Sequence, residues 1–98
     1  VALAEAGAFC VLMEMVTTQT AQLVDEAVGA VPTIGIGASN ATTGQVLVWQ
    51  DMMGVRTGRV PRFVKQFAQV GQVMEDAARA YREQVRSGEF PAAEHTFE

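Results

Sequence analysis

One acidic side chain, Glu14, is the strongest candidate for chemistry in this sequence. It ends the apolar run Ala8–Met13, which is typical of a buried strand, and Met15 follows it directly. Apolar neighbours remove a carboxylate from water, and this tunes a general base or acid to work near neutral pH. We therefore interpret Glu14 as a catalytic base or acid at the C-terminal end of a strand. An ordinary solvated glutamate is the alternative that position alone leaves open.

Further charged residues follow a later apolar run. Asp51 follows the apolar run at 46–49 and could line the same active-site mouth as Glu14, although such an aspartate is more often a loop cap. A basic cluster comes next and consists of Arg56, Arg59, Arg62 and Lys65. A cluster of this kind is usually a solvated surface and less often binds an anionic ligand.

Two of the three glycines in the stretch Pro32–Asp51, Gly35 and Gly37, lie within a predicted strand and at its end. Glycine weakens a strand unless a ligand or a neighbouring group must approach its backbone closely. The spacing Gly35-x-Gly37-x-x-Asn40 lacks the third glycine of a dinucleotide fingerprint, so that match is weak. We expect close approach by a substrate or by a neighbouring segment, and both stay open. Gly37 and Ser39 are weak candidates for binding the substrate.

Apolar runs that alternate with amphipathic segments predict an α/β fold. The first unit is strand, helix, strand, with a connection long enough for a right-handed parallel crossover. The strands lack polar alternation, which predicts cover on both faces of the sheet. The expected elements are strands at 9–14, 33–36 and 46–49, helices at 17–28 and 61–85 with a break or kink at Gly71, and an irregular tail at 89–98.

Composition narrows the class of protein. The 98 residues predict at most one domain, and the formal net charge of −4 argues against nucleic-acid binding. No apolar run approaches the roughly 18 residues of a membrane span, so we expect a cytoplasmic protein that does not contact membranes. The single cysteine, Cys10, is expected to be a small buried hydrophobe in a reducing compartment. The lone His95 predicts no metal site.

The beginning of the chain has the pattern of a helix end. Val1–Ala6 reads as the last turns of a helix, and Gly7 reads as its cap. Three strands cannot close a barrel, and as an open sheet they would leave long apolar edges unpaired. We therefore expect residues 1–98 to form a single partial domain at the C-terminal end of a longer protein.

Four segments of the chain match the pattern of a known enzyme family. They are AEAGAFCVLMEMV, PTIGIGASNATTGQVLVWQDMMG, RFVKQFAQV and SGEFPAAEHTF. In this order and at this spacing they resemble the C-terminal part of ketopantoate hydroxymethyltransferase, also called 3-methyl-2-oxobutanoate hydroxymethyltransferase. The resemblance covers nearly the whole chain. Its most specific block is IGIGA followed by GQVLV and WQD.

The resemblance implies a (βα)8 TIM barrel of the phosphoenolpyruvate and pyruvate type, to which this chain would contribute about the last three strands. It also implies hydroxymethyl transfer from 5,10-methylenetetrahydrofolate to 3-methyl-2-oxobutanoate, which gives 2-dehydropantoate in pantothenate and coenzyme A synthesis. In the family, a glutamate of the motif VLE-x-V removes the C3 proton, and that position here is Glu14. Mg²⁺ would stabilise the enolate, with its ligands on earlier strands and none in this chain. A decameric homo-oligomer is implied as well.

The chain departs from the family pattern at three positions. Ser39 stands where a glycine is usual, and Thr43 stands where an aspartate is usual. Both departures concern the loop after the second strand and leave Glu14 untouched. Gln50 replaces a more frequent histidine.

Two other interpretations stay open. A carbon–carbon lyase of the same barrel superfamily would share the barrel and the metal-bound enolate, but the GQVLV and FPAAEHTF segments are not expected in it. An inactive truncated product is the second, and we expect the 98 residues alone to lack activity because the family's metal-binding motifs are missing from them.

Overall fold

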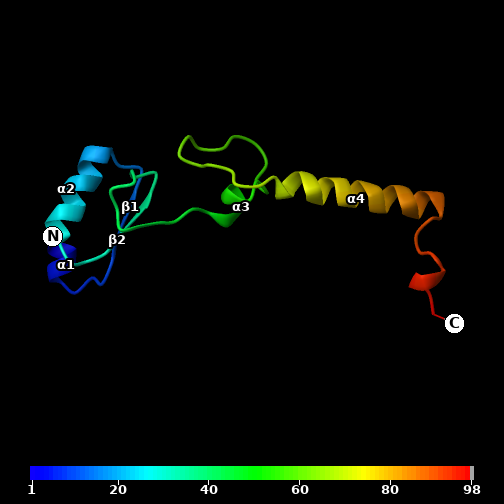
Figure 1. Ribbon diagram of the computed structural model, residues 1–98, viewed down its shortest axis with the longest axis horizontal. Coiled ribbons are helices and arrows are strands. Elements are labelled where there is room, and N and C mark those ends of the chain that lie inside the picture. The colour runs from blue at the N-terminus through cyan, green and yellow to red at the C-terminus, as the bar shows by residue number, and fades with distance from the viewer. Residues whose placement is uncertain (98) are drawn as a thin grey trace.

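The computed structural model describes residues 1–97. It contains a small parallel sheet, with helices before, between and after its strands (Figure 1). The three strands pair in the order β1-β2-β3, and this confirms the predicted α/β fold with parallel strands. The elements are α1 (Ala2–Glu5), β1 (Val11–Glu14), α2 (Thr18–Val28), β2 (Thr33–Ile36), β3 (Gly44–Gln45), α3 (Trp49–Met52), α4 (Val70–Ser87) and the 3₁₀ turn η1 (Ala93–His95).

The first strand, helix, strand unit forms as the sequence predicts. The Thr17 hydroxyl accepts a hydrogen bond from the Thr20 N–H at 3.3 Å and caps the start of α2. Gly29, at φ 61°, ends the helix in a conformation that suits glycine. β1 and β2 then pair side by side, with Glu14 opposite Ile36. The C-terminal ends of both strands therefore meet at one edge of the sheet.

Only one face of the sheet is covered by the described residues. Met13, Ala21 and Ala38 form the core on the α2 side. Because side chains alternate along a strand, Leu12 and Glu14 lie on the opposite face, where Leu12 is 56% exposed. The predicted cover on both faces is wrong for residues 1–97, because α2 supplies a single layer. Glu14 consequently lies on the open face.

The third strand is shorter than its sequence predicts. Residues 46–49 were expected to be extended, but β3 ends at Gln45 and Trp49 begins α3. The Val46 N–H still donates to the Gly35 carbonyl at 3.0 Å. β2 ends at Ile36, so the chain beyond Val46 runs past the end of the strand with which it could pair.

The expected helix at 61–85 begins only at Val70, and Gly71 lies in its first turn instead of at a kink. Backbone hydrogen bonds to α3 explain the late start. The N–H groups of Phe67, Val70 and Gly71 donate to the carbonyls of Met52, Met53 and Gly54 at 2.8, 2.9 and 3.0 Å. The Met53 and Gly54 carbonyls thus satisfy the N–H groups of Val70 and Gly71, which lie at the start of α4 where no helical carbonyl can reach them. Residues 53–69 therefore form a loop whose two ends, its base, are joined by these hydrogen bonds.

The helix α4 extends away from the sheet, and the molecule measures 67 × 30 × 15 Å (Figure 1). The large apolar side chains of α4 are exposed in this chain. They are Val73, Met74, Tyr81 and Val85. In the tail the Phe90 ring packs edge-on against Tyr81, with 5.6 Å between the ring centres. Most of the apolar face of α4 thus has no cover from residues 1–97.

Two smaller expectations are also corrected or qualified. Cys10 is half-buried instead of fully buried, because it precedes β1 at the open end of the sheet beside Phe9, which is 90% exposed. The tail expected to be irregular contains the turn η1. Among residues 1–97, no helix combines the length and apolar character that crossing a membrane requires.

Replacing Gly71 with alanine tests the junction between α3 and α4. The added Cβ would lie 2.6 Å from the Gly54 carbonyl oxygen, so the two backbones would have to separate. Although alanine favours a helix, we expect Gly71→Ala to lower the free energy of unfolding by about 1–3 kcal/mol, as overpacking does.

Urea denaturation measures this change. Gly44→Ala is the matched control, because its Cβ would meet only Ile34 Cγ1, at 4.0 Å. Equal stability of the two variants would show that the junction tolerates a side chain and would contradict its proposed role.

Candidate active site

The carboxylate of Glu14 lies at the C-terminal edge of the parallel sheet, where the sequence predicts it. This edge is where open and closed parallel sheets bind ligands. Met15 follows at φ 51°, and its N–H donates to the Ile36 carbonyl at 3.0 Å. A methionine with positive φ is strained by roughly 1–3 kcal/mol, and such strain collects at functional sites. Glu14 itself is exposed, so the predicted removal of its carboxylate from water is absent in these residues.

A cavity of about 580 Å³ opens beside Glu14. One wall is the sheet edge, and the other is the loop 53–69, which folds back from α3 toward the sheet (Figure 1). Asp51 lines the same cavity, as its position after the third apolar run indicated. The full lining consists of Glu14, Met15, Ile36, Val48, Asp51, Arg56, Arg59, Pro61, Arg62 and Phe63.

Close packing of Phe63 against Gly37 holds the tip of the loop on the end of β2. A Cβ at Gly37 would lie 2.9 Å from Phe63 Cδ1, and Gly37 has φ 61°. At Gly35 the space is filled by Thr42, whose Oγ1 would lie 2.9 Å from an added Cβ. Of the two expectations for these glycines, the structure shows approach by neighbouring side chains of the same chain. Sequence reasoning missed Phe63 as part of the site, because an isolated phenylalanine does not indicate which glycine it meets.

The basic cluster separates into three environments. The Arg56 guanidinium lies 3.2 Å from Asp51 Oδ1, and Asp51 is only 5% exposed. This ion pair ties the start of the loop to α3, and it corrects the predicted loop-cap role of Asp51, because the carboxylate bonds the Arg56 side chain instead of backbone N–H groups. Lys65 Nζ lies 4.9 Å from the centre of the Phe67 ring and lines a different cavity.

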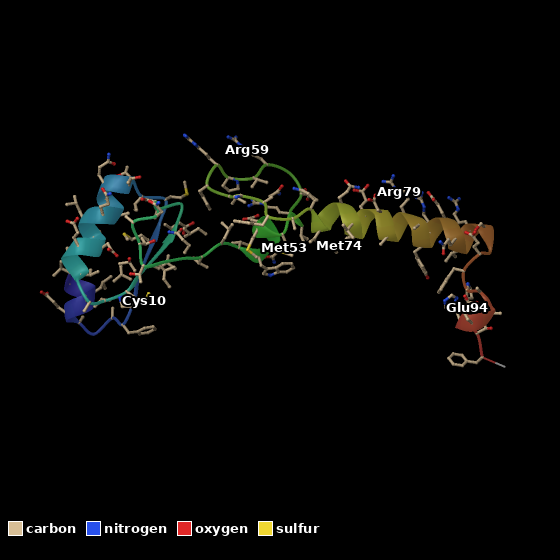
Figure 2. All side chains as sticks on the ribbon, viewed as in Figure 1. Cys10, Met53, Arg59, Met74, Arg79 and Glu94 are labelled. Atoms are coloured by element: carbon tan, nitrogen blue, oxygen red, sulfur yellow. The ribbon has the colours of Figure 1, made fainter. Side chains whose placement is uncertain are left out.

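Arg59 and Arg62 form the third environment. Both line the Glu14 cavity from the loop, and Figure 2 shows Arg59 on the segment between α3 and α4. The sequence identified their charge but not their position. The signal that could have placed them is the pair Gly54 and Gly71, since two glycines at this spacing permit the backbone contact that folds the loop back.

The two weak substrate-binding candidates, Gly37 and Ser39, line a neighbouring cavity of about 620 Å³ instead of the Glu14 cavity. Arg62 and Phe63 line both cavities and stand between them. Ser39 has φ 71°, and its hydroxyl accepts a hydrogen bond from the Ala41 N–H at 3.3 Å. That bond supports a backbone conformation that glycine adopts without strain.

Thr43, the second departure from the expected pattern, has a structural role. The Thr33 N–H donates to the Thr43 hydroxyl at 3.2 Å, and the Thr43 N–H donates to the Thr33 hydroxyl at 3.1 Å. The buried Thr33 hydroxyl also donates to the carboxylate of Asp25 on α2. The loop before β3 is therefore fixed to β2 and α2 by side-chain hydrogen bonds.

Metal ligands do not gather in the described part of the chain. No three His, Cys, Asp or Glu side chains of residues 1–97 lie close enough together to hold a metal ion. Glu14 and Asp51 share a cavity, but Asp51 is paired with Arg56. His95 lies in the tail, where its Nδ1 accepts a hydrogen bond from the Ala92 N–H at 3.2 Å.

Comparison with known proteins decides the family. The model of the ketopantoate hydroxymethyltransferase family matches residues 1–93. The chain belongs to this family. The 3-methyl-2-oxobutanoate hydroxymethyltransferase of Arthrobacter sp. (strain FB24) is 62% identical over 97 residues, which make up 99% of this chain and 32% of that protein.

Other members of the family match a similar share of the chain. The proteins of that name from Paenarthrobacter aurescens and Clostridium novyi are 61% and 48% identical to this chain, over 99% and 95% of its length. The matched region makes up 32% and 34% of those two proteins. The chain thus spans about a third of the length of the curated relatives it matches.

Substitutions at Ser39 test the cost of its departure from the glycine expected in the family. We expect Ser39→Gly to raise the free energy of unfolding by about 0.5 kcal/mol, because glycine removes the strain at φ 71° but also loses the hydroxyl's bond. Ser39→Ala keeps the strain and loses the bond, so it should lower stability by about 1 kcal/mol. Thermal unfolding should rank stability in the order Ser39→Gly, unsubstituted protein, Ser39→Ala, from highest to lowest. Any other order would contradict this account.

Proposed function

We propose that this chain supplies the catalytic base of a ketopantoate hydroxymethyltransferase. The protein that contains it would transfer a hydroxymethyl group from 5,10-methylenetetrahydrofolate to 3-methyl-2-oxobutanoate. The observation that carries the proposal is the position of Glu14 at the carboxyl edge of a parallel sheet, on its open face and beside a cavity of about 580 Å³. Family membership supports hydroxymethyl transfer to 3-methyl-2-oxobutanoate, because its curated members are named for that transfer, whereas the folate donor comes from the resemblance alone.

A (βα)8 barrel is the architecture we propose for the whole protein. The three parallel strands and the crossover helix α2 are the units from which such a barrel is built. The face of the sheet opposite α2 would be the barrel interior. Leu12, Ile34 and Ile36 lie on that face together with Glu14 and would pack against side chains of further strands.

The proposed step for Glu14 is removal of the C3 proton of 3-methyl-2-oxobutanoate. The C3–H bond breaks, the proton moves to a carboxylate oxygen of Glu14, and the electron pair delocalises toward the C2 carbonyl oxygen. The resulting enolate carbon would then bond to the one-carbon unit, while water supplies the hydroxyl oxygen, the two bonds from that carbon to the folate nitrogens break, and the nitrogens take up the proton from Glu14 and one proton from water. Residues 1–97 offer no ligand set for the Mg²⁺ that the resemblance implies, so we assign to this chain only the proton transfer.

Isotope exchange tests the assignment in the full-length protein that carries these residues. Glu14→Gln keeps the shape of the side chain but removes its basicity, so exchange of the C3 deuteron of labelled 3-methyl-2-oxobutanoate should fall by at least about 100-fold. Proton NMR in the presence of Mg²⁺ measures the exchange rate.

Glu83→Gln is the matched control, because Glu83 is exposed on α4 and lies outside the Glu14 cavity. It should exchange at the unsubstituted rate. Undiminished exchange in Glu14→Gln, with the protein folded, would sink the assignment of the base.

A further inference from the structure

We propose that Arg56 keeps Glu14 in its basic, ionised form by neutralising the buried negative charge of Asp51. The inference rests on the proposed function, which assigns Glu14 as the base. All three residues line one cavity. Glu14 ends β1, whereas Asp51 lies on α3 and Arg56 lies in the loop that follows α3 (Figure 1). Two carboxylates in one cavity oppose each other's ionisation, so a cation paired with one of them favours the ionised form of the other.

Burial makes a partner charge necessary for Asp51. The residue is only 5% exposed in a chain that spans about a third of the length of its relatives. Further protein around α3 would lower this exposure and could not raise it. A buried carboxylate stays charged only when a cation or hydrogen-bond donors compensate it. Arg56 supplies this compensation, because its Nη1 donates to Asp51 Oδ1 and Oδ2 at 3.2 and 3.4 Å.

The main chain fixes Arg56 beside this carboxylate. The N–H groups of Val55 and Arg56 both donate to the Gln50 carbonyl, at 2.9 and 3.2 Å. Gln50 directly precedes Asp51, so these bonds return the start of the loop to the turn of α3 that carries the carboxylate. The ion pair and the bonds that place it therefore lie entirely within residues 50–56, and forming them requires no other part of the protein.

The sign of each charge predicts what its loss would do. Asp51 and Arg56 together add no net charge beside Glu14. The other charged groups that line the cavity among residues 1–97 are Arg59 and Arg62, both exposed, and water screens exposed charges more strongly than buried ones. Loss of Asp51 alone leaves a positive charge beside Glu14, and loss of Arg56 alone leaves a negative one. Arg56 is thus a positioning residue, because it acts on Glu14 through Asp51.

The pH dependence of C3-deuteron exchange tests this charge balance in the full-length protein that carries these residues. Exchange requires ionised Glu14, so its rate rises with pH. In Asp51→Asn the remaining charge of Arg56 favours ionised Glu14, and the pH of half-maximal exchange should fall by roughly 0.3–1 pH unit. In Arg56→Gln the remaining charge of Asp51 opposes ionisation, and the same midpoint should rise by a similar amount.

Two further variants should leave the midpoint where it is. The double substitution Asp51→Asn with Arg56→Gln removes both charges at once. Arg79→Gln is the matched control, because it breaks an exposed ion pair with Glu75, at 2.7 Å on α4, outside the Glu14 cavity. A purely structural role would lower the maximal rate without moving the midpoints in opposite directions. Single variants whose midpoints stay in place, or move in the same direction, would therefore overturn the proposal.

The test stays decisive if Arg56→Gln fails to fold, which could follow from leaving a buried carboxylate without its partner. Asp51→Asn and the double variant both lack that carboxylate and differ only in the charge at position 56. Equal midpoints in these two variants would overturn the proposal. Absence of exchange at every pH in the unsubstituted protein would count against the proposed function, whereas exchange with a midpoint insensitive to these charges would count only against this inference.

Discussion

The backbone hydrogen bonds that join the end of α3 to the start of α4 are the constraint on which the candidate site depends. The carbonyls of Met52, Met53 and Gly54 accept hydrogen bonds from the N–H groups of Phe67, Val70 and Gly71. The same contacts end one helix and begin the next, and they return the intervening loop toward the sheet. Without this closure only the Phe63–Gly37 contact and the Arg56–Asp51 ion pair would hold the loop that forms one wall of the cavity beside Glu14.

The parallel pairing of β1 and β2 supplies the other wall. Their register places Glu14 opposite Ile36, and α2 covers only the face that carries Met13. Glu14 therefore points to the side on which the sheet is open, and Phe63 reaches the same edge through its contact with Gly37. Strand pairing places Glu14 at the carboxyl edge of the sheet, and loop closure brings the loop 53–69 to the same edge.

Local signals in the sequence were sufficient for β1, α2 and β2. Thr17 and Gly29 mark the ends of α2, and both act in the structure as their residue types predict. The segments 46–49 and 61–69 were predicted wrongly, because their conformations depend on partners far along the chain. A β-branched run becomes a strand only where another strand lies beside it, and a helical pattern is interrupted where tertiary hydrogen bonds take its donors.

The candidate site, like the fold, could be predicted from the sequence only in part. Glu14 could be identified because its position at the end of an apolar run is local information. The exposure of Glu14 could not be predicted from the sequence, because burial depends on what covers the open face of the sheet. The charge of Arg59 and Arg62 was evident, but their proximity to Glu14 follows from the folded path of the loop.

The attachment of this loop also bears on how the site could diversify. Its base is held by main-chain atoms, and its tip is held by one aromatic ring on one glycine. Main-chain hydrogen bonds do not depend on side-chain identity, so positions between the base and the tip, apart from Arg56 with its ion pair to Asp51, are free to change without altering the path of the loop. Evolution could therefore alter which ligands the mouth of the cavity accepts while the sheet, the strand register and Glu14 remain as they are.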